Sequence, residues 1–324
     1  MNLASLETNH ILIIFRGNLF AAHSVPQFIP MLARKLVAVG YLVTVLSSDA
    51  KLCLDMPRDV TFENQDFLEI EDLQGYLSKF DQLIYLGYET FIATSEESCH
   101  TEFIRNLSTI SKLFINAANL GKKVIFFSPG SAVYGEPKEL PLVETHELNP
   151  LNCYGFTSSQ IEQYASFLAR TNNFRFVCLR QSNVFGIGQR PFSGQGFIPT
   201  AIATILKGES VKIFGQGDAI RDYIYIDDLV LGAFEVIKNS EITGIYNLGT
   251  GVGVSTTDII SELVTLMNEV NFEVKVVRLP LNSIDVSANI LDSRKIHKEI
   301  GWCAATTLPE GLRQTRDWIM AEGL

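Results

Sequence analysis

The sequence predicts an α/β fold in which a doubly wound parallel sheet is followed by a smaller C-terminal lobe. Short apolar runs rich in β-branched and aromatic residues alternate with longer segments of helical spacing, which is typical of βαβ units with a sheet buried on both faces. The strand-like runs cover residues 11–15, 42–46, 82–86, 123–127 and 174–179. After Arg180 the sequence changes to loops rich in glycine and proline. We therefore predict a sheet domain over residues 1–185 and a second lobe over residues 186–324, with segments that return to the sheet.

Two long helices follow from apolar periodicity. Over residues 101–120 apolar side chains recur at intervals of three and four, and Gly121 provides the stop. A second helix is predicted over residues 157–169. Pro26 and Pro30 are unfavourable inside a helix, so the first helix after the first strand should begin near Pro30.

Composition excludes several classes of protein. The chain has 324 residues, and its 26 Lys and Arg against 36 Asp and Glu give a net charge of −10. This charge repels polyanions, so we predict no nucleic-acid partner. The apolar runs are of strand length, far below the roughly 18 residues that span a bilayer, so we predict no membrane insertion. The amino-terminal segment resembles no secretion signal, which indicates a cytoplasmic protein.

Cysteine and histidine give no sign of a metal site or of disulfides. The five cysteines are widely separated and form no C-x-x-C pair, and histidines do not cluster near them. We expect reduced, structural thiols and no bound metal.

Several motifs follow the predicted strands, where an open parallel sheet binds its ligands. They are FSPGSAVYGEP (127–137), LNPLNCYG (148–155), LRQSNVFG (179–186), IFGQGDAIRDYIYIDD (213–228), YNLGTG (246–251) and the segment 291–302. In this order and spacing they resemble the extended short-chain dehydrogenase/reductase family. Within that family they are most similar to the nucleotide-sugar 4-epimerases and dehydratases, of the UDP-glucose 4-epimerase type. The resemblance implies a Rossmann-type sheet domain and a nucleotide-sugar-binding lobe.

The resemblance also implies a redox chemistry carried by NAD, in which a tyrosine accepts the proton of a sugar hydroxyl while hydride passes to the cofactor. Tyr154 would be that base. The family lowers the pKa of this phenol with a lysine four residues later, and here Ser158 stands in that place. The alternative for Tyr154 is a packed aromatic residue with its hydroxyl satisfied. Ser131 or Ser128 would bind the reacting oxygen, although both also suit a turn, and Gly130 occupies the expected position.

The dinucleotide turn departs most from the family. The three glycine positions carry Phe15, Asn18 and Ala21. Glycines there permit a tight turn and a close approach of the pyrophosphate, so Phe15 is unfavourable while Asn18 and Ala21 are tolerable. We predict that NAD(P) binds weakly or not at all.

Two carboxylates remain as cofactor candidates. Asp49 follows the second strand, where the family binds the adenosine ribose. Alternatively, Ser47 with Arg16 and Lys51 would suit a 2′-phosphate, or this segment is a polar loop cap. Asp66 matches the position that contacts adenine.

The sugar-nucleotide side matches the family better. Asn183 corresponds to the residue that contacts the substrate, Phe214 to the lining of the base pocket, Gln195 to a nucleotide-covering loop and Arg221 to the diphosphate ligand. Arginine suits a diphosphate because its planar fork binds phosphate oxygens in pairs. The alternative for Arg221 is a surface ion pair with a neighbouring aspartate. A second expected arginine is replaced by Asn282.

Two functions follow from this pattern. The first is a protein that binds a UDP-hexose-like nucleotide sugar, with impaired or absent hydride transfer. The second is an active NAD(P)-dependent nucleotide-sugar epimerase, dehydratase or reductase that uses Tyr154. In relatives the helices predicted at 101–120 and 157–169 form a dimer interface, so we predict a homodimer or a pair with an active relative. Polysaccharide biosynthesis is the usual setting of such relatives.

Overall fold

The main sheet is parallel, as the sequence predicts, and it has seven strands, of which β3 and β10 were not among the five predicted runs. The computed structural model describes residues 9–16, 27–87, 99–194, 196–280 and 286–324. The strands lie in the order β10 (Gly244–Leu248), β6 (Arg175–Gln181), β5 (Lys123–Pro129), β4 (Gln82–Gly87), β1 (His10–Arg16), β2 (Leu42–Ser47) and β3 (Thr61–Glu63). The chain winds outward in both directions from β1 and β4, so the topological switch point lies between these two strands.

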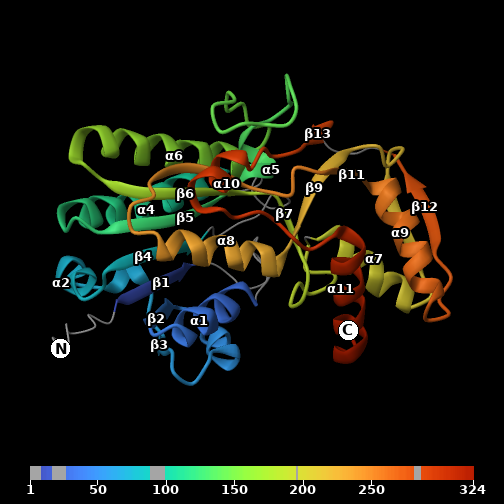
Figure 1. Cartoon of the computed structure of the whole chain (residues 1–324), viewed down its shortest axis with the longest axis horizontal. Coiled ribbons are helices and arrows are strands. Elements are labelled where there is room, and N and C mark those ends of the chain that lie inside the picture. The colour runs from blue at the N-terminus through green and yellow to red at the C-terminus, as the bar shows by residue number, and fades with distance from the viewer. Residues whose placement is uncertain (1–8, 17–26, 88–98, 195, 281–285) are drawn as a thin grey trace.

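Helices cover both faces of this sheet (Figure 1). One face carries α4 (Cys99–Asn119) and α6 (Cys153–Asn172), with α2 (Leu73–Ser78) beside α4, and the other carries α1 (Phe28–Ala38) and α8 (Ile226–Lys238). The apolar residues of β1 alternate between two cores, because Ile11 and Ile13 pack toward α1 whereas Leu12 and Ile14 pack toward α4. A sheet buried in this way reads as a continuous apolar run, which is the pattern that identified the strand.

The second lobe lies beyond the carboxyl edge of the sheet (Figure 1). It holds β7 (Asn183–Phe185), β9 (Ile220–Tyr225), β11 (Gly253–Ser255) and β13 (Ala288–Asn289) in one sheet, and β8 (Ser210–Phe214) and β12 (Lys275–Leu279) in another. Its helices are α7 (Phe197–Leu206), α9 (Thr256–Asn268), α10 (Arg294–Ile300) and α11 (Leu308–Glu322). Between these segments the chain returns to the sheet domain through α8 and β10.

Helix α6 is longer than the sequence predicts, mainly at its amino-terminal end. The helix predicted from residue 157 begins at Cys153, because Asn152 accepts a hydrogen bond from the Gly155 N–H at 2.8 Å and caps the first turn. Two 3₁₀ helices, η1 (Ala50–Asp55) and η2 (Phe67–Glu69), and the short helix α5 (Gly130–Val133) complete the sheet domain. In the part of the chain that the structure describes, no helix has the length and apolar character that crossing a bilayer requires.

Candidate functional site

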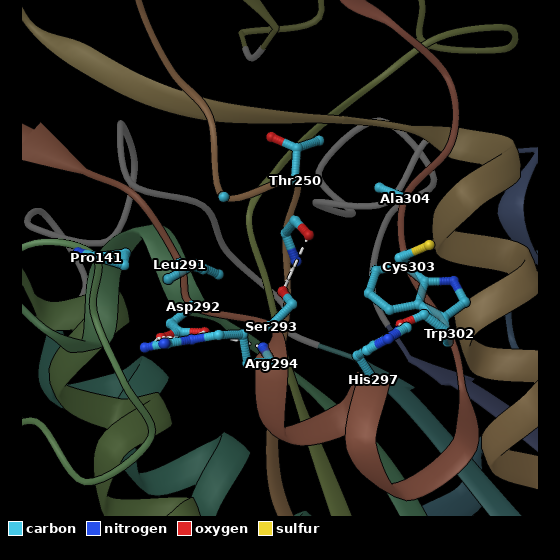
Figure 2. Close-up of a pocket in the computed structure, with 12 residues that line it drawn as sticks. Pro141, Thr250, Leu291, Asp292, Ser293, Arg294, His297, Trp302, Cys303 and Ala304 are labelled. Atoms are coloured by element: carbon cyan, nitrogen blue, oxygen red, sulfur yellow. Dashed lines mark hydrogen bonds and ion pairs between the residues drawn. The ribbon is translucent and has the colours of Figure 1, made fainter.

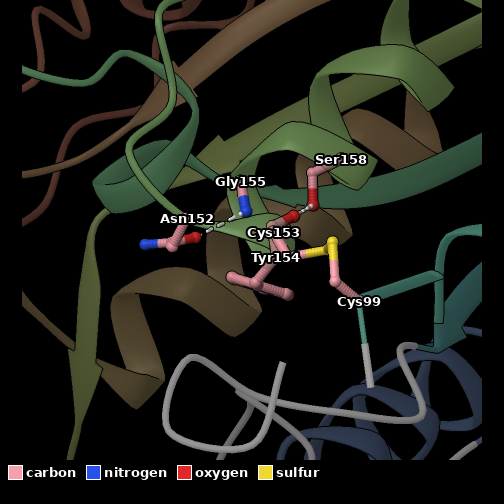
Figure 3. Close-up of a disulfide and its surroundings, with 6 residues drawn as sticks. All are labelled: Cys99, Asn152, Cys153, Tyr154, Gly155 and Ser158. Carbon is pink, nitrogen blue, oxygen red and sulfur yellow. Dashed lines mark hydrogen bonds between the residues drawn. A yellow bond between two sulfur atoms is a disulfide. The ribbon is translucent and has the colours of Figure 1, made fainter. Parts of the chain in front are cut away.

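The amino-terminal end of α6 presents the tyrosine motif at the carboxyl edge of the sheet (Figure 3). Tyr154 is in the first turn, and its side chain is buried with 1% exposure. The Ser158 hydroxyl donates to the Tyr154 carbonyl oxygen at 2.8 Å. This bond lies inside the helix, so Ser158 is used locally, as serine often is within helices.

A disulfide joins the first residues of two helices beside this tyrosine. Cys99 begins α4 and Cys153 begins α6, and their Sγ atoms are bonded (Figure 3). The prediction of reduced thiols is therefore wrong for this pair. The separation of 54 positions between the cysteines concealed it, because only the parallel pairing of β4 and β5, which precede α4 and α6, brings the two helix starts together. Cys53, Cys178 and Cys303 are free.

The predicted serines lie at the end of β5. Ser128 is buried inside the strand and Ser131 is half-buried in α5. Gly130 lies between these two serines. A side chain is excluded at this position, because a Cβ there would lie 2.8 Å from the Gln181 carbonyl oxygen. The close packing of α5 on β6 therefore explains why Gly130 stands where the family places a hydroxyl.

Several buried polar atoms around this edge make no hydrogen bond within the described structure. These atoms lie at the carboxyl ends of β5 and β6, at the start of α6 and in β13. They are Ser128 Oγ, Gln181 Oε1, Ser182 Oγ, Thr157 Oγ1 and Asn289 Oδ1. The strand pairing sets Gln181 beside Pro129, and Asn289 Nδ2 donates to the Gly130 carbonyl at 3.0 Å, so these elements meet at one place. Buried polar atoms are normally paired, so this edge of the sheet holds an unusual concentration of buried side-chain oxygens without a hydrogen-bond partner among the described residues.

A buried ionic network fixes α6 against the sheet. Glu162 accepts from Arg180 through both carboxylate oxygens, and both side chains are almost fully buried. Arg180 also donates to the Tyr134 hydroxyl at 2.8 Å, and Tyr134 donates to Asn247 at 2.7 Å. Burial raises the pKa of Tyr134 to about 12. Glu162 follows Tyr154 by two turns, so the network lies under the same helix face and holds it in place.

Sequence reasoning missed this network. The signal was the spacing of Tyr154, Ser158 and Glu162 at intervals of four, which places the carboxylate on the buried face of a helix and so requires a buried cation.

On the cofactor side, the carboxylates are engaged by the protein itself. Asp66 accepts from the Leu68 N–H and from Arg16, and Asp49 caps η1 by accepting from the Lys51 N–H at 3.0 Å. The interpretation of residues 47–51 as a polar cap agrees with these bonds. Arg16 bonds to Asp66 in this structure, and the alternative of a 2′-phosphate held by Ser47, Arg16 and Lys51 stays a prediction. Asn18 and Ala21 lie outside the described residues.

Phe15 does not crowd the crevice in the way that the sequence suggested. Its side chain is 2% exposed and packs into the core on the α1 face. The strand simply continues through Phe15 and Arg16, which pair with Leu86 and Gly87 of β4. Helix α1 begins at Phe28, two residues before Pro30, and its first-turn side chains Phe28 and Ile29 are also buried.

The predicted substrate residues come from the second lobe and its junction with the sheet. Arg221 donates to the Ile220 carbonyl at 2.8 Å and to the Val286 carbonyl at 2.9 Å. The alternative of an ion pair with Asp222 is wrong, because Asp222 is buried and accepts from Thr250, Gly251 and Leu291. Half-buried Asn183 begins β7, and Phe214 is 56% exposed at the end of β8. Gln195 lies outside the described residues.

A separate cavity of about 380 Å³ lies between the loop after β10 and helix α10 (Figure 2). No predicted site residue lines it. Its polar groups bond to one another: Ser293 with Gly249, Asp292 with Arg294, and His297 with the Trp302 carbonyl. Elsewhere, no three His, Cys, Asp or Glu side chains of the described residues gather as metal ligands would.

A Rossmann-type sheet whose carboxyl edge meets a second lobe defines a class of nucleotide-binding α/β proteins. The pattern of the NAD dependent epimerase/dehydratase family matches residues 30–249, and the chain belongs to this family.

Known proteins agree with this assignment. The chain is 29% identical over 248 residues to the dTDP-4-dehydro-6-deoxyglucose reductase of Escherichia coli, covering 75% of this chain and 77% of that protein. It is 34% identical over 247 residues to a trifunctional UDP-glucose 4,6-dehydratase/UDP-4-keto-6-deoxy-D-glucose 3,5-epimerase/UDP-4-keto-L-rhamnose-reductase of Arabidopsis thaliana, covering 74% of this chain but only 35% of that protein. The structure of the Thermotoga maritima UDP-glucose 4-epimerase with UDP-glucose superimposes with a TM-score of 0.86 at 26% identity, covering 97% of this chain and 100% of that one.

Proposed function

We propose that this chain binds a nucleoside diphosphate sugar of the UDP-hexose type at the carboxyl edge of β5 and β6, and that it does not transfer hydride. The observation that carries the second part is Ser158. An ordinary tyrosine hydroxyl is about 0.1% ionised at neutral pH, and a neighbouring cation lowers such a pKa by roughly 1 to 3 units. Ser158 brings no charge to Tyr154, and its hydroxyl is committed to the helix.

The polar atoms at the ends of β5 and β6 support sugar binding. The Gln181 side-chain oxygen is buried beside the helix of Tyr154 and makes no hydrogen bond within the described structure, and Ser131 is half-buried in α5. A hexose offers hydroxyl groups that both donate and accept, so it satisfies such atoms better than an apolar ligand does. We assign Tyr154, Ser128 and Ser131 to this sugar subsite as binding residues.

The nucleotide part would lie against the second lobe. We assign Arg221 to the diphosphate, Phe214 to the base, and Asn183 and Gln195 to neighbouring contacts. The guanidinium of Arg221 is oriented by two carbonyl oxygens, and such orientation favours paired contacts with phosphate oxygens.

The described residues that flank β1 offer little to a bound NAD(P), and the turn between them, residues 17–26, lies outside the described part of the chain. A pyrophosphate needs the free N–H groups of a helix start close to the strand end. Here α1 begins with the buried residues Phe28 and Ile29, and Pro30 has no N–H to offer. Asp49 and Asp66 are engaged internally. We therefore derive no catalytic step through the cofactor.

The test is a comparison of ligands on the purified protein. Denatured protein should release no stoichiometric NAD(H), measured by chromatography and absorbance. UDP-glucose should raise the melting temperature, since a ligand at 100 times its Kd stabilises by about 2.7 kcal/mol, whereas NAD should not. Arg221→Ala should reduce the response to UDP-glucose. One equivalent of released NAD together with turnover of UDP-glucose would favour the active-enzyme alternative.

We also propose a homodimer that pairs through the outer faces of α4 and α6. Ile104 and Ile115 on α4, and Phe156 and Phe167 on α6, are each between 38% and 51% exposed. The apolar spacing of the helix at 101–120 also includes Ile110 and Phe114, but these two side chains pack into the core against the sheet. The apolar surface offered to a second copy therefore comes from the opposite side of the same helices.

A further inference from the structure

One arginine side chain bridges the switch point of the sheet. Arg16 is the last residue of β1, and its side chain is 11% exposed. One terminal nitrogen of its guanidinium lies 3.1 Å from Asp66 Oδ2, and the other donates to the Thr109 hydroxyl at 2.6 Å. Thr109 in turn donates to the Arg105 carbonyl in α4 at 2.9 Å, so the acceptor is itself held in place.

The two partners of Arg16 lie on opposite sides of the switch point. Asp66 follows β3, on the side of the sheet that contains β2 and β3. Thr109 belongs to α4, which connects β4 to β5 on the other side. The guanidinium therefore ties together the two halves of the sheet at the crevice where open α/β sheets bind their ligands.

We propose that Arg16 takes the place that a dinucleotide would fill, so that this chain completes the switch point with its own ion pair. The proposal rests on the function proposed above and is argued from the contacts of Arg16 and Asp66. Asp66 uses one oxygen for the Leu68 N–H and the other for Arg16, so its carboxylate is already engaged. A ligand that enters there would have to separate Arg16 from Asp66. Separating a partly buried, charge-assisted pair is unfavourable, because it leaves a charged group without its partner.

A double-mutant cycle without ligand tests the bridge. Arg16→Ala and Asp66→Ala should each lower the melting temperature by roughly 3 to 8 °C, and the double variant should fall little further, because either change alone removes the pair. Thr109→Val, which keeps the shape and loses the hydroxyl, should cause a smaller fall. Lys138→Ala is the matched control, since the Lys138–Glu147 pair is fully solvent-exposed and its loss should leave the melting temperature unchanged.

Ligand additions separate this proposal from the proposed function. Addition of about 1 mM NAD should not change the melting temperature of the wild type. UDP-glucose should raise the melting temperature of the wild type and of Arg16→Lys, which keeps the charge, by the same amount. Additive effects of Arg16→Ala and Asp66→Ala, or a wild-type response to NAD, would overturn the bridge. A missing response to UDP-glucose with the coupling intact would overturn only the proposed function. If Arg16→Ala fails to fold, Thr109→Val and Arg16→Lys still report the coupling.

Discussion

The disulfide between α4 and α6 should contribute strongly to stability. Cys99 and Cys153 are 54 residues apart in sequence, and cross-linking them removes the entropy of closing that loop in the unfolded chain. For a loop of about 55 residues the chain-entropy relation gives about 4 kcal/mol at 25 °C. The value is an upper figure, because residual structure in the unfolded state reduces the entropy that the bridge removes.

The assay is urea denaturation of the wild type and of Cys99→Ser, each with and without a reductant. Without reductant, Cys99→Ser should unfold at a markedly lower urea concentration than the wild type. With reductant, the two proteins should unfold together, because neither then carries the bridge. Cys303→Ser removes an exposed free thiol and serves as the control that should change neither curve.

Thiol counting gives an independent measurement. Denatured, unreduced wild type should titrate three thiols, which are those of Cys53, Cys178 and Cys303. Five reactive thiols would refute the bridge and restore the prediction of reduced cysteines. A bridge that forms but stabilises the fold by less than about 1 kcal/mol would refute the entropy argument while leaving the structure intact.

Four further outcomes are expected. Ser158→Lys should produce no turnover of UDP-glucose, followed by chromatography, because the ammonium alone does not create a cofactor site. Glu162→Gln should lower the free energy of unfolding in urea by about 3 kcal/mol, since it leaves the buried Arg180 charge without its partner. Phe167→Asp should convert a dimer to a monomer in light scattering. Burial lowers the pKa of Lys123 to about 8 from the ordinary 10.5. Between these two values the unfolded chain binds one more proton than the folded chain, so the free energy of unfolding should rise as the pH rises across that range. Lys123→Met should abolish this rise, measured by urea denaturation at several pH values.

The fold was predictable because its signals are local. The five predicted strands of the main sheet are short apolar runs, and Gly121 marks the end of a helix. The start of α6 was missed because the cap, Asn152, precedes the apolar pattern. The family also followed from motifs that stand just after strands, where a parallel sheet must place its ligand contacts. Within each element, neighbouring residues carry enough information for both inferences.

The contacts that the sequence did not reveal join distant parts of the chain. The sequence suggested Arg16 as a contact for a 2′-phosphate, and only the fold shows that Asp66 and Thr109 converge on its guanidinium. The same holds for Cys99 and Cys153, which no spacing rule pairs. Phe15 illustrates the opposite error, because a bulky residue expected to obstruct a ligand lies within β1, which continues to Arg16, and its side chain packs into the core.

The bonds that position α6 on the sheet come from other residues than those at the predicted cofactor contacts, so under the proposed function the two can change independently. Glu162, Arg180 and Tyr134 hold α6 on the sheet through buried bonds, so the position of Tyr154 does not depend on a cofactor. Ser158 occupies the position where the family has a lysine. Arg16 lies at the crevice where we propose that it takes the place of a dinucleotide. Each forms its bonds within the chain, to the Tyr154 carbonyl and to Asp66. On the proposed function, changes at these two positions would affect hydride transfer while the bonds that hold α6 on the sheet stay in place.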